Sequence, residues 1–444
     1  MFAATWALGN LIHLVNVEGQ GFTNPAGWVN AFAAIYVLFK PGSVRRVSFL
    51  ASAQIVEFVW SSPFSADHQS LAAAANVVLL ITILAIARKR GRWPEAHEVG
   101  HSAFPALRIV LLIAYVAAAL AKYNTTFLDA STSCAAYLGD LTTFGLLGGD
   151  GFLGHIHVFA AVVPETLVPL LLVVPFTRRF GVRFACGFHL FIALSPALVV
   201  GDFSVILIAL FLLFASDRDI EGVYSAIRRR VDRDIVGQRL SRIGSSPAAV
   251  AVLAIGVGII SSRAGLASTV LAWGITIATA PRILLALLGT PLSSDAPELG
   301  VRRISPAQGT VCALLVVWAL SPYIGLRTMG VFTMFSNLRT EGPDSNHLFM
   351  PSIDLTDMQN DIVVPIAGSS SHFDDIVEND YAVPMFELRR ELAEHPDAHI
   401  EGHRNGQPLD DADRQDLAEP LPGLLEKLLL FRTVPAGTTR LCGN

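Results

Sequence analysis

Long apolar runs constrain the fold of this chain more than any other feature. Residues 106–122 and 154–176 each come close to the roughly 20 apolar residues that an α-helix needs to cross the hydrocarbon core of a bilayer. Hydrophobic residues make up 52% of the 444 residues and charged residues only 16%, whereas soluble domains are about 25% charged. The sequence therefore predicts an all-α polytopic membrane bundle, with a small α+β extracytoplasmic domain at the C-terminus.

We predict about eleven membrane segments, and the basic residues between them indicate their orientation. The segments are residues 2–17, 26–40, 46–61, 70–87, 106–122, 154–176, 184–200, 203–216, 248–261, 267–289 and 308–324. Loops after the even-numbered segments carry Lys and Arg, whereas loops after the first, third, fifth and seventh carry none. By the positive-inside rule, the N-terminus is expected in the cytoplasm and the tail outside the cell membrane.

Composition divides the chain into four stretches. Residues 1–216 and 248–326 are membrane bundle, 217–247 form a basic amphipathic loop expected on the cytoplasmic membrane surface, and 327–444 form the polar tail. Within the tail, residue patterns predict strands at His347–Leu355 and Asp361–Ala367, helices at Pro384–His395 and Leu424–Arg432, and a hairpin turn at Asn405-Gly406. The tail is thus expected to be a small α+β domain packed on the outer face of the bundle.

The four cysteines fall into two groups. Cys186 and Cys312 lie inside membrane segments, where they are expected to be plain core residues. Cys134 and Cys442 both lie in the predicted outer compartment, where disulfides persist. The sequence leaves open whether these two form a bridge or remain free thiols.

Lys122 is the most unusual charged residue of the membrane part. It is one of only four lysines and ends the apolar run 107–121. The loop that follows, Tyr123–Phe152, has no Lys or Arg and carries three aspartates. An ionisable group at such a position is a functional hypothesis by default, and the alternative is a lysine that snorkels to the membrane interface.

Several other polar side chains lie within or beside apolar segments. They are His13, Glu57, His155, His157, Glu165 and His189. Because an unpaired polar group in hydrocarbon is costly, these side chains are expected to face the bundle interior or a wet cavity. Glu165 could pair with Lys122, and such a pair could equally well fix helix packing. No set of four Cys or His residues has zinc-ligand spacing, so we expect no metal site.

A buried lysine in such a bundle suggests acid–base chemistry. Desolvation disfavours the charged ammonium, and an amine close to neutrality is a competent general base. Nearby histidines could bind a hydroxyl group or relay a proton. A quinol is a natural substrate here because it is lipid-soluble and must lose its phenolic protons when it is oxidised.

Three stretches carry a resemblance to a known family. They are Ile113–Ala135, which contains Lys122 and Phe127, Pro164–Gly181, and Gly187–Phe203, which contains a Phe-His pair. Weaker similarities lie at Asp67–Leu71 and Met334–His347. Residues 60–350 resemble the HTTM family, membrane proteins related to the vitamin K-dependent gamma-carboxylase.

The resemblance implies a catalytic site and its substrates. Lys122 matches the base that deprotonates vitamin K hydroquinone, and His68 and His189 match histidines of the same site. The reduced quinone, O2, CO2 and a protein or peptide substrate at the outer face are implied in the same way. Ala121 stands where the carboxylase has a second lysine, and the tail is much shorter than the carboxylase's lumenal region. Quinol chemistry is therefore better supported than glutamate carboxylation.

Three functions are compatible with these features. The first is a membrane enzyme of the carboxylase or quinol-oxygenating type, with Lys122, His68 and His189 as catalytic residues. The second is a transporter or lipid-binding protein whose His and Glu side chains line a pathway. The third is a scaffold with an extracytoplasmic partner-binding domain. The chain has no basic tract that would indicate nucleic-acid binding.

Overall fold

The computed structural model divides into two compact units. Unit 1 comprises Met1–Trp60, Leu71–Tyr115 and Pro164–Leu315, and unit 2 comprises Ser61–Ser70, Val116–Val163 and Val316–Asn444. The structure describes all residues except 17–21, 147–150, 194–199, 232–245, 264–265, 290–296, 343, 369–373, 380, 396–397, 399, 410–416, 418–420, 422, 436–441 and 443–444. These two units are defined by contacts between residues in space. The four stretches predicted above are defined by residue composition, and they stay a prediction.

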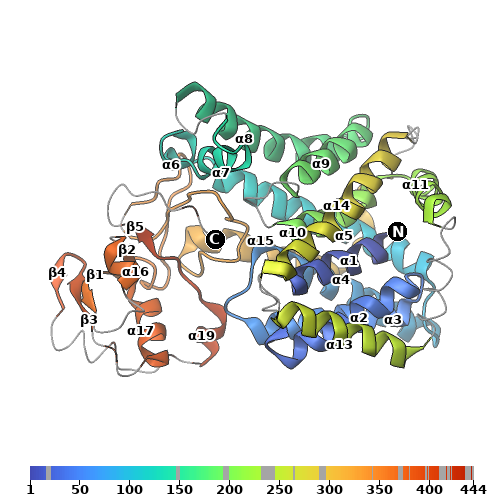
Figure 1. Ribbon diagram of the computed structural model, residues 1–444, viewed down its shortest axis with the longest axis horizontal. Coiled ribbons are helices and arrows are strands. Elements are labelled where there is room, and N and C mark those ends of the chain that lie inside the picture. The colour runs from blue at the N-terminus through green and yellow to red at the C-terminus, as the bar shows by residue number, and fades with distance from the viewer. Residues whose placement is uncertain are drawn as a thin grey trace. The chain divides into compact units, whose positions relative to one another are not determined.

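Unit 1 is built from helices (Figure 1). Those wholly or mainly within it are α1 (Phe2–Val15), α2 (Pro25–Phe39), α3 (Val44–Ser61), α4 (Asp67–Arg90), α5 (Ala96–Ala121), α9 (Arg178–Ala193), α10 (Gly201–Phe211), α11 (Asp217–Val231), α13 (Pro247–Arg263) and α14 (Leu266–Gly289). Helix α1 packs on α2 and α10. The approach to α10 is close because Gly9 has no side chain: a Cβ there would lie 2.8 Å from Cγ1 of Ile206.

Fewer helices are suited to cross a membrane than the sequence predicted. Among the described residues, four are long and apolar enough: Asp67–Arg90, Ala96–Ala121, Gly151–Val173 and Pro306–Ile324. The expectation of about eleven spans was wrong because several apolar runs form short helices. Helices α1, α2 and α10 have 14, 15 and 11 residues, below the roughly 20 needed for a span. Every residue of α10 except Phe203 is buried, as expected of a core helix.

The basic loop 217–247 is partly helical. Its first half forms α11, which begins with two aspartates and carries the arginine run in its last turn. Residues 232–245 of the predicted amphipathic loop lie outside the described residues. The predicted position of the loop on a membrane surface stays a prediction.

Unit 2 joins short helices, a long irregular stretch and a small α+β tail (Figure 1). It contains α6 (Thr125–Leu128), α7 (Cys134–Thr142), the first part of α8 (Gly151–Val173), the last part of α15 (Pro306–Leu320) and the single turn η4 (Ser321–Ile324). The described residues of the stretch 325–361, which are all except 343, form no regular helix or strand. This irregular stretch carries most of the polar contacts described below.

The tail is built on a five-stranded antiparallel sheet in the order β4-β3-β1-β2-β5. The strands are β1 (Ile362–Gly368), β2 (Tyr381–Pro384), β3 (Ile400–Arg404), β4 (Gln407–Pro408) and β5 (Val434–Pro435), and the helices are α16 (Asp374–Glu378), α17 (Met385–Glu394) and α19 (Gly423–Leu428). Val363, Val383, Leu388 and Ile400 form its core. The predicted mixture of strands and helices near the C-terminus is therefore confirmed, whereas its standing as a separate extracytoplasmic domain stays a prediction.

Individual elements of the tail were predicted with mixed success. The strand at Asp361–Ala367, the helix at Pro384–His395 and the hairpin turn are confirmed; Asn405 and Gly406 have positive φ angles of 49° and 81°, as a tight hairpin requires. The prediction of a strand at His347–Leu355 was wrong. The backbone N–H groups of this segment bond to carbonyls at the ends of different helices instead of to a neighbouring strand. The helix predicted to reach Arg432 ends at Leu428, since the N–H of Phe431 bonds to the Glu387 carboxylate.

The structure decides between the two alternatives for Cys134 and Cys442, which were a disulfide or two free thiols. Cys134 at the start of α7 and Cys442 near the C-terminus form a disulfide, with their Cα atoms 5.0 Å apart. Cys186 and Cys312 are free and buried. The disulfide ties the end of the tail to the segment that follows Lys122 in the chain.

Glu387 is a buried carboxyl in the tail whose ionisation affects folding. Its side chain forms an ion pair with Arg390 at 3.2 Å and accepts the N–H of Phe431 at 2.8 Å. Burial raises the pKa of the Glu387 carboxyl from 4.5 to about 7, against the opposing effect of Arg390. Between these two values the folded protein holds a proton that the unfolded chain has lost.

We expect the free energy of unfolding to fall as pH rises from about 4.5 to about 7 and then to level off. The decrease should be at most about 3 kcal/mol, since each pKa unit corresponds to about 1.4 kcal/mol. Glu387→Gln removes the titrating group, so the melting temperature of this variant should depend less on pH across this range. Glu394→Gln, at an exposed position of the same helix, is the control. An unchanged slope in Glu387→Gln would contradict the assignment.

Candidate functional site

Lys122 follows the last residue of α5 and is buried in unit 2. Only 5% of the residue is exposed. Its ammonium donates a long hydrogen bond of 3.5 Å to the carbonyl oxygen of Met334. Nζ also lies 5.7 Å from the centre of the Phe127 ring, within cation–π range. The side chain therefore points toward protein groups rather than into bulk solvent.

Asp67 supplies the negative charge of this site. It is the first residue of α4 and is 6% exposed. Its two carboxylate oxygens accept the N–H groups of Phe332 and Met334, at 2.8 and 2.9 Å. The ammonium of Lys122 interacts electrostatically with this carboxylate. The peptide groups of Met334 thus connect both charges, since its N–H faces Asp67 and its carbonyl faces Lys122.

The segment around Met334 has an unusual backbone. Phe332, Phe335 and Asn337 all have positive φ angles, of 66°, 53° and 51°. Bulky residues rarely adopt this conformation, which costs on the order of 1–3 kcal/mol at each position and is concentrated at functional sites. Here the turns allow two N–H groups to converge on the single carboxylate of Asp67.

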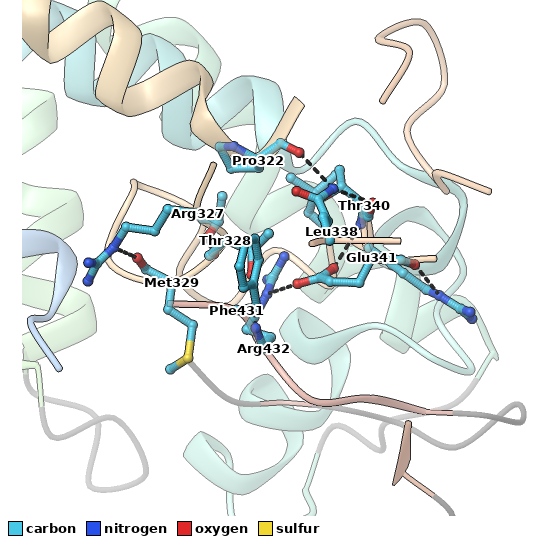
Figure 2. Close-up of polar contacts among 12 residues, drawn as sticks. Pro322, Arg327, Thr328, Met329, Leu338, Thr340, Glu341, Phe431 and Arg432 are labelled. Carbon is cyan, nitrogen blue, oxygen red and sulfur yellow. Dashed lines mark hydrogen bonds and ion pairs between the residues drawn. The ribbon is translucent and has the colours of Figure 1, made fainter. Parts of the chain in front are cut away.

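Buried polar side chains hold the first part of this segment. The carbonyl of Gly330 accepts hydrogen bonds from Ser70 at 2.8 Å and from the Trp318 indole at 3.0 Å. Arg327, which is 1% exposed, donates to the carbonyls of Met329 and Leu428, and Figure 2 shows the first of these bonds. These contacts fix the backbone that leads to Phe332.

Asparagine side chains hold the other part of the segment. Asn124 donates to the carbonyls of Ala121 and Ser336 at 2.8 and 2.7 Å, while its own oxygen caps α6 at Phe127. Asn337 accepts the N–H of Cys134 at 2.7 Å. The chain on both sides of Lys122 is thereby connected to the segment that carries Met334.

A buried ion pair joins the segment to the tail. Glu341 is fully buried and pairs with Arg432 at 3.3 Å, as Figure 2 shows. Its second oxygen accepts the N–H of Thr340 at 3.0 Å. Because an unpaired buried charge is costly, each of these two residues depends on the other. The tail is therefore coupled to the segment beside Lys122.

His347 at the end of the segment is a neutral structural residue. Its Nδ1 accepts the N–H of Met350 at 3.0 Å, so the proton lies on Nε2, which donates to the carbonyl of Leu120 at 2.9 Å. Burial lowers the pKa of His347 below its usual value of 6.5. The ring links this segment to the last turn of α5.

The predicted catalytic residues lie in both units. His68 follows Asp67 in the first turn of α4 and is buried in unit 2, together with Lys122. His189 belongs to unit 1, where its Nε2 forms a hydrogen bond with the hydroxyl of Tyr115, and the rings of Phe203 and Phe211 flank it. The grouping of Lys122, His68 and His189 in one site stays a prediction.

The supporting residues have different environments. Glu165 interacts electrostatically with Tyr115 in unit 1, so Glu165 and His189 share a partner. The predicted pair of Glu165 with Lys122, which belongs to unit 2, stays a prediction. His155 is exposed and bonds to the Gly151 carbonyl of its own helix.

His157, the other supporting histidine, is half-buried on α8. Its ring lies against α7, where a Cβ on Gly139 would come within 2.3 Å of the ring. The missing side chain at Gly139 therefore lets the imidazole approach the α7 backbone.

Unit 1 contains a second charged cluster, around His13. Its Nδ1 lies 3.2 Å from Asp202 and its Nε2 lies 3.7 Å from Glu57. Asn30 donates to the other Glu57 oxygen at 3.1 Å. Asp202 and Glu57 are 3% and 5% exposed. His13 and Glu57 are thus turned away from the surface, in agreement with the prediction that they face the bundle interior or a wet cavity.

Sequence reasoning missed two acidic residues that are central to these clusters. Asp67 was noted only as part of a weak family similarity, and Asp202 was included only within the matched stretch Gly187–Phe203. The available signal was the same for both: each is an aspartate at the beginning of an apolar run. An acidic group in that position needs a partner inside the bundle.

Comparisons with known proteins do not add to this description. No protein-family model matches the chain, and neither the curated proteins nor the solved structures give a match. The resemblance to the HTTM family and to the carboxylase therefore stays a prediction from the motifs.

We expect Asp67→Asn to loosen the segment around Met334. The neutral amide has one acceptor oxygen for two N–H groups, and hydrogen bonds to a charged group contribute about 1.5–3 kcal/mol. Amide hydrogen exchange of Phe332 and Met334 should accelerate at least about tenfold. Asp354→Asn is a matched control because Asp354 accepts the N–H groups of Thr356 and Asn360 elsewhere in unit 2. Unchanged exchange at 332–334 would disprove the anchoring role of Asp67.

Proposed function

We propose that the protein is an integral membrane enzyme that acts on a lipid-soluble quinol, with Lys122 as general base. The observation that carries this proposal is a 5%-exposed lysine amine placed beside a buried carboxylate and an aromatic ring. The motif resemblance supports the same residue and the same substrate class. His68 and His189 are proposed to bind the quinol oxygen, as that resemblance implies.

The proposed step is removal of a phenolic proton. Lys122 enters this step as the free amine, after its ammonium has released a proton to solvent. The O–H bond of the quinol then breaks, its proton moves to the Lys122 amine, and the electron pair stays on the oxygen as phenolate. Asp67 and the face of Phe127 favour the resulting ammonium by charge attraction and cation–π interaction. Asp67 thus acts through Lys122 as a positioning and stabilising residue.

Two observations support the proposed location. Four helices are suited to cross a membrane, and unit 2 contains a disulfide, which persists in oxidising compartments. We therefore place Lys122 at the outer face of the cell membrane, with the N-terminus in the cytoplasm. Dioxygen, CO2 and a peptide acceptor enter only through the resemblance, and glutamate carboxylation is not part of this proposal.

Lys122→Met should abolish turnover of the quinol, since loss of a general base lowers rates by about 10²–10⁴-fold. The measurement is mass analysis of the quinone or epoxide formed when a ubiquinol, menaquinol or vitamin K hydroquinone is incubated with purified protein in air, with dioxygen as the oxidant that the resemblance implies. Lys427→Met is the matched control, because Lys427 is an exposed lysine of unit 2 whose ammonium donates to the Ser62 carbonyl at 2.8 Å. Full turnover by a folded Lys122→Met variant would refute the mechanism.

A proton-coupled transporter is the second candidate, and the His13 cluster favours it. Ionisable groups inside membrane bundles often mark ion or proton pathways. If the protein is a transporter, the wild-type protein should leave the quinol chemically unchanged. Asp202→Asn should then reduce proton flux into dye-loaded proteoliposomes at least about fivefold. Asp219→Asn, a buried acid that caps α11, is the control. Equal flux in both variants would exclude the pathway through His13.

A further inference from the structure

Residues 347–356 of unit 2 expose an unusual set of large apolar side chains. Leu348, Phe349, Ile353 and Leu355 are 52%, 60%, 55% and 67% exposed, although they lie in irregular backbone. From His347 to Ile353 the sequence has no Lys, Arg, Asp or Glu. Such a concentration of exposed apolar groups in one segment indicates an interaction surface.

The backbone of this segment is attached to the ends of two candidate membrane spans. The N–H of Leu348 bonds to the Tyr123 carbonyl at 3.0 Å, just after the end of α5. The N–H groups of Ile353 and Leu355 bond to the carbonyls of Tyr323 and Ile324, at the end of α15 and η4. The segment therefore lies at the level where both helices end.

The charged residue of the segment is turned toward the backbone. Asp354 accepts hydrogen bonds from the N–H groups of Thr356 and Asn360 at 3.1 and 2.8 Å. Met350 packs inward against Ala121 and Tyr323. Polar atoms are thus satisfied on the inner side, while the four apolar side chains extend outward.

We propose that residues 347–356 lie in the bilayer interface and insert Leu348, Phe349, Ile353 and Leu355 among the lipid acyl chains. A span ends where hydrocarbon meets headgroups, so apolar side chains fixed at that level contact lipid. The inference needs the membrane location but not the quinol chemistry. It also places a lipid-contacting ring near Lys122, since Phe349 packs on Tyr123 at 5.9 Å between ring centres.

The test uses full-length protein in phosphatidylcholine vesicles. Phe349→Cys is labelled with the environment-sensitive dye NBD in a background where Cys186 and Cys312 are alanine and the disulfide is intact. Ile366→Cys is the matched control, because Ile366 is an exposed apolar residue of β1, at 55% exposure. Each label is quenched separately with a nitroxide on the upper acyl chain of the lipid and with aqueous iodide.

The lipid nitroxide should quench the label at 349 at least about twofold more strongly than the label at 366, and iodide should show the reverse order. Equal lipid quenching at both positions would overturn the proposal. Protection of position 349 from both quenchers would also overturn it and would instead indicate a protein contact, such as a second copy of the chain. Turnover of the quinol is not used as a readout, so this outcome is independent of the function proposed for Lys122.

Discussion

The attachment of Asp67 to the peptide of Met334 is the interaction on which the rest of unit 2 depends. It fixes a strained segment in place, and that segment in turn provides the carbonyl that receives Lys122. Without the carboxylate, the N–H groups of Phe332 and Met334 would lose their acceptor, and the Lys122 ammonium would lose an opposite charge. Charge neutrality inside a poorly hydrated region is therefore the constraint that organises this part of the molecule.

In both charged clusters, one in each unit, a basic side chain interacts with buried carboxylates. In unit 2 a lysine is matched by an aspartate, and in unit 1 a histidine lies between two carboxylates. Each cluster stands among apolar helices, where ionisable side chains are retained when they have a function or a specific partner. The first cluster is the basis of the proposed acid–base chemistry on a quinol, and the second is the basis of the alternative proposal of proton transport.

The C-terminal tail is connected to the rest of unit 2 by a disulfide. The disulfide between Cys134 and Cys442 connects the end of the tail to the segment that follows Lys122, and the ion pair between Glu341 and Arg432 connects two parts of the tail. The buried Glu387 adds a group in the tail whose charge changes near neutral pH.

The sequence by itself determined the helical class, the small C-terminal sheet with its Asn405-Gly406 hairpin, and the importance of examining Lys122. These follow from local composition and turn chemistry. It overestimated the number of membrane spans, because an apolar run of 11–15 residues looks the same whether its helix crosses lipid or is buried among other helices. Only the tertiary structure revealed Asp67 beside Lys122 and Asp202 beside His13. These partners are 55 and 189 positions apart in the chain, and no local pattern encodes a contact between residues so distant in sequence.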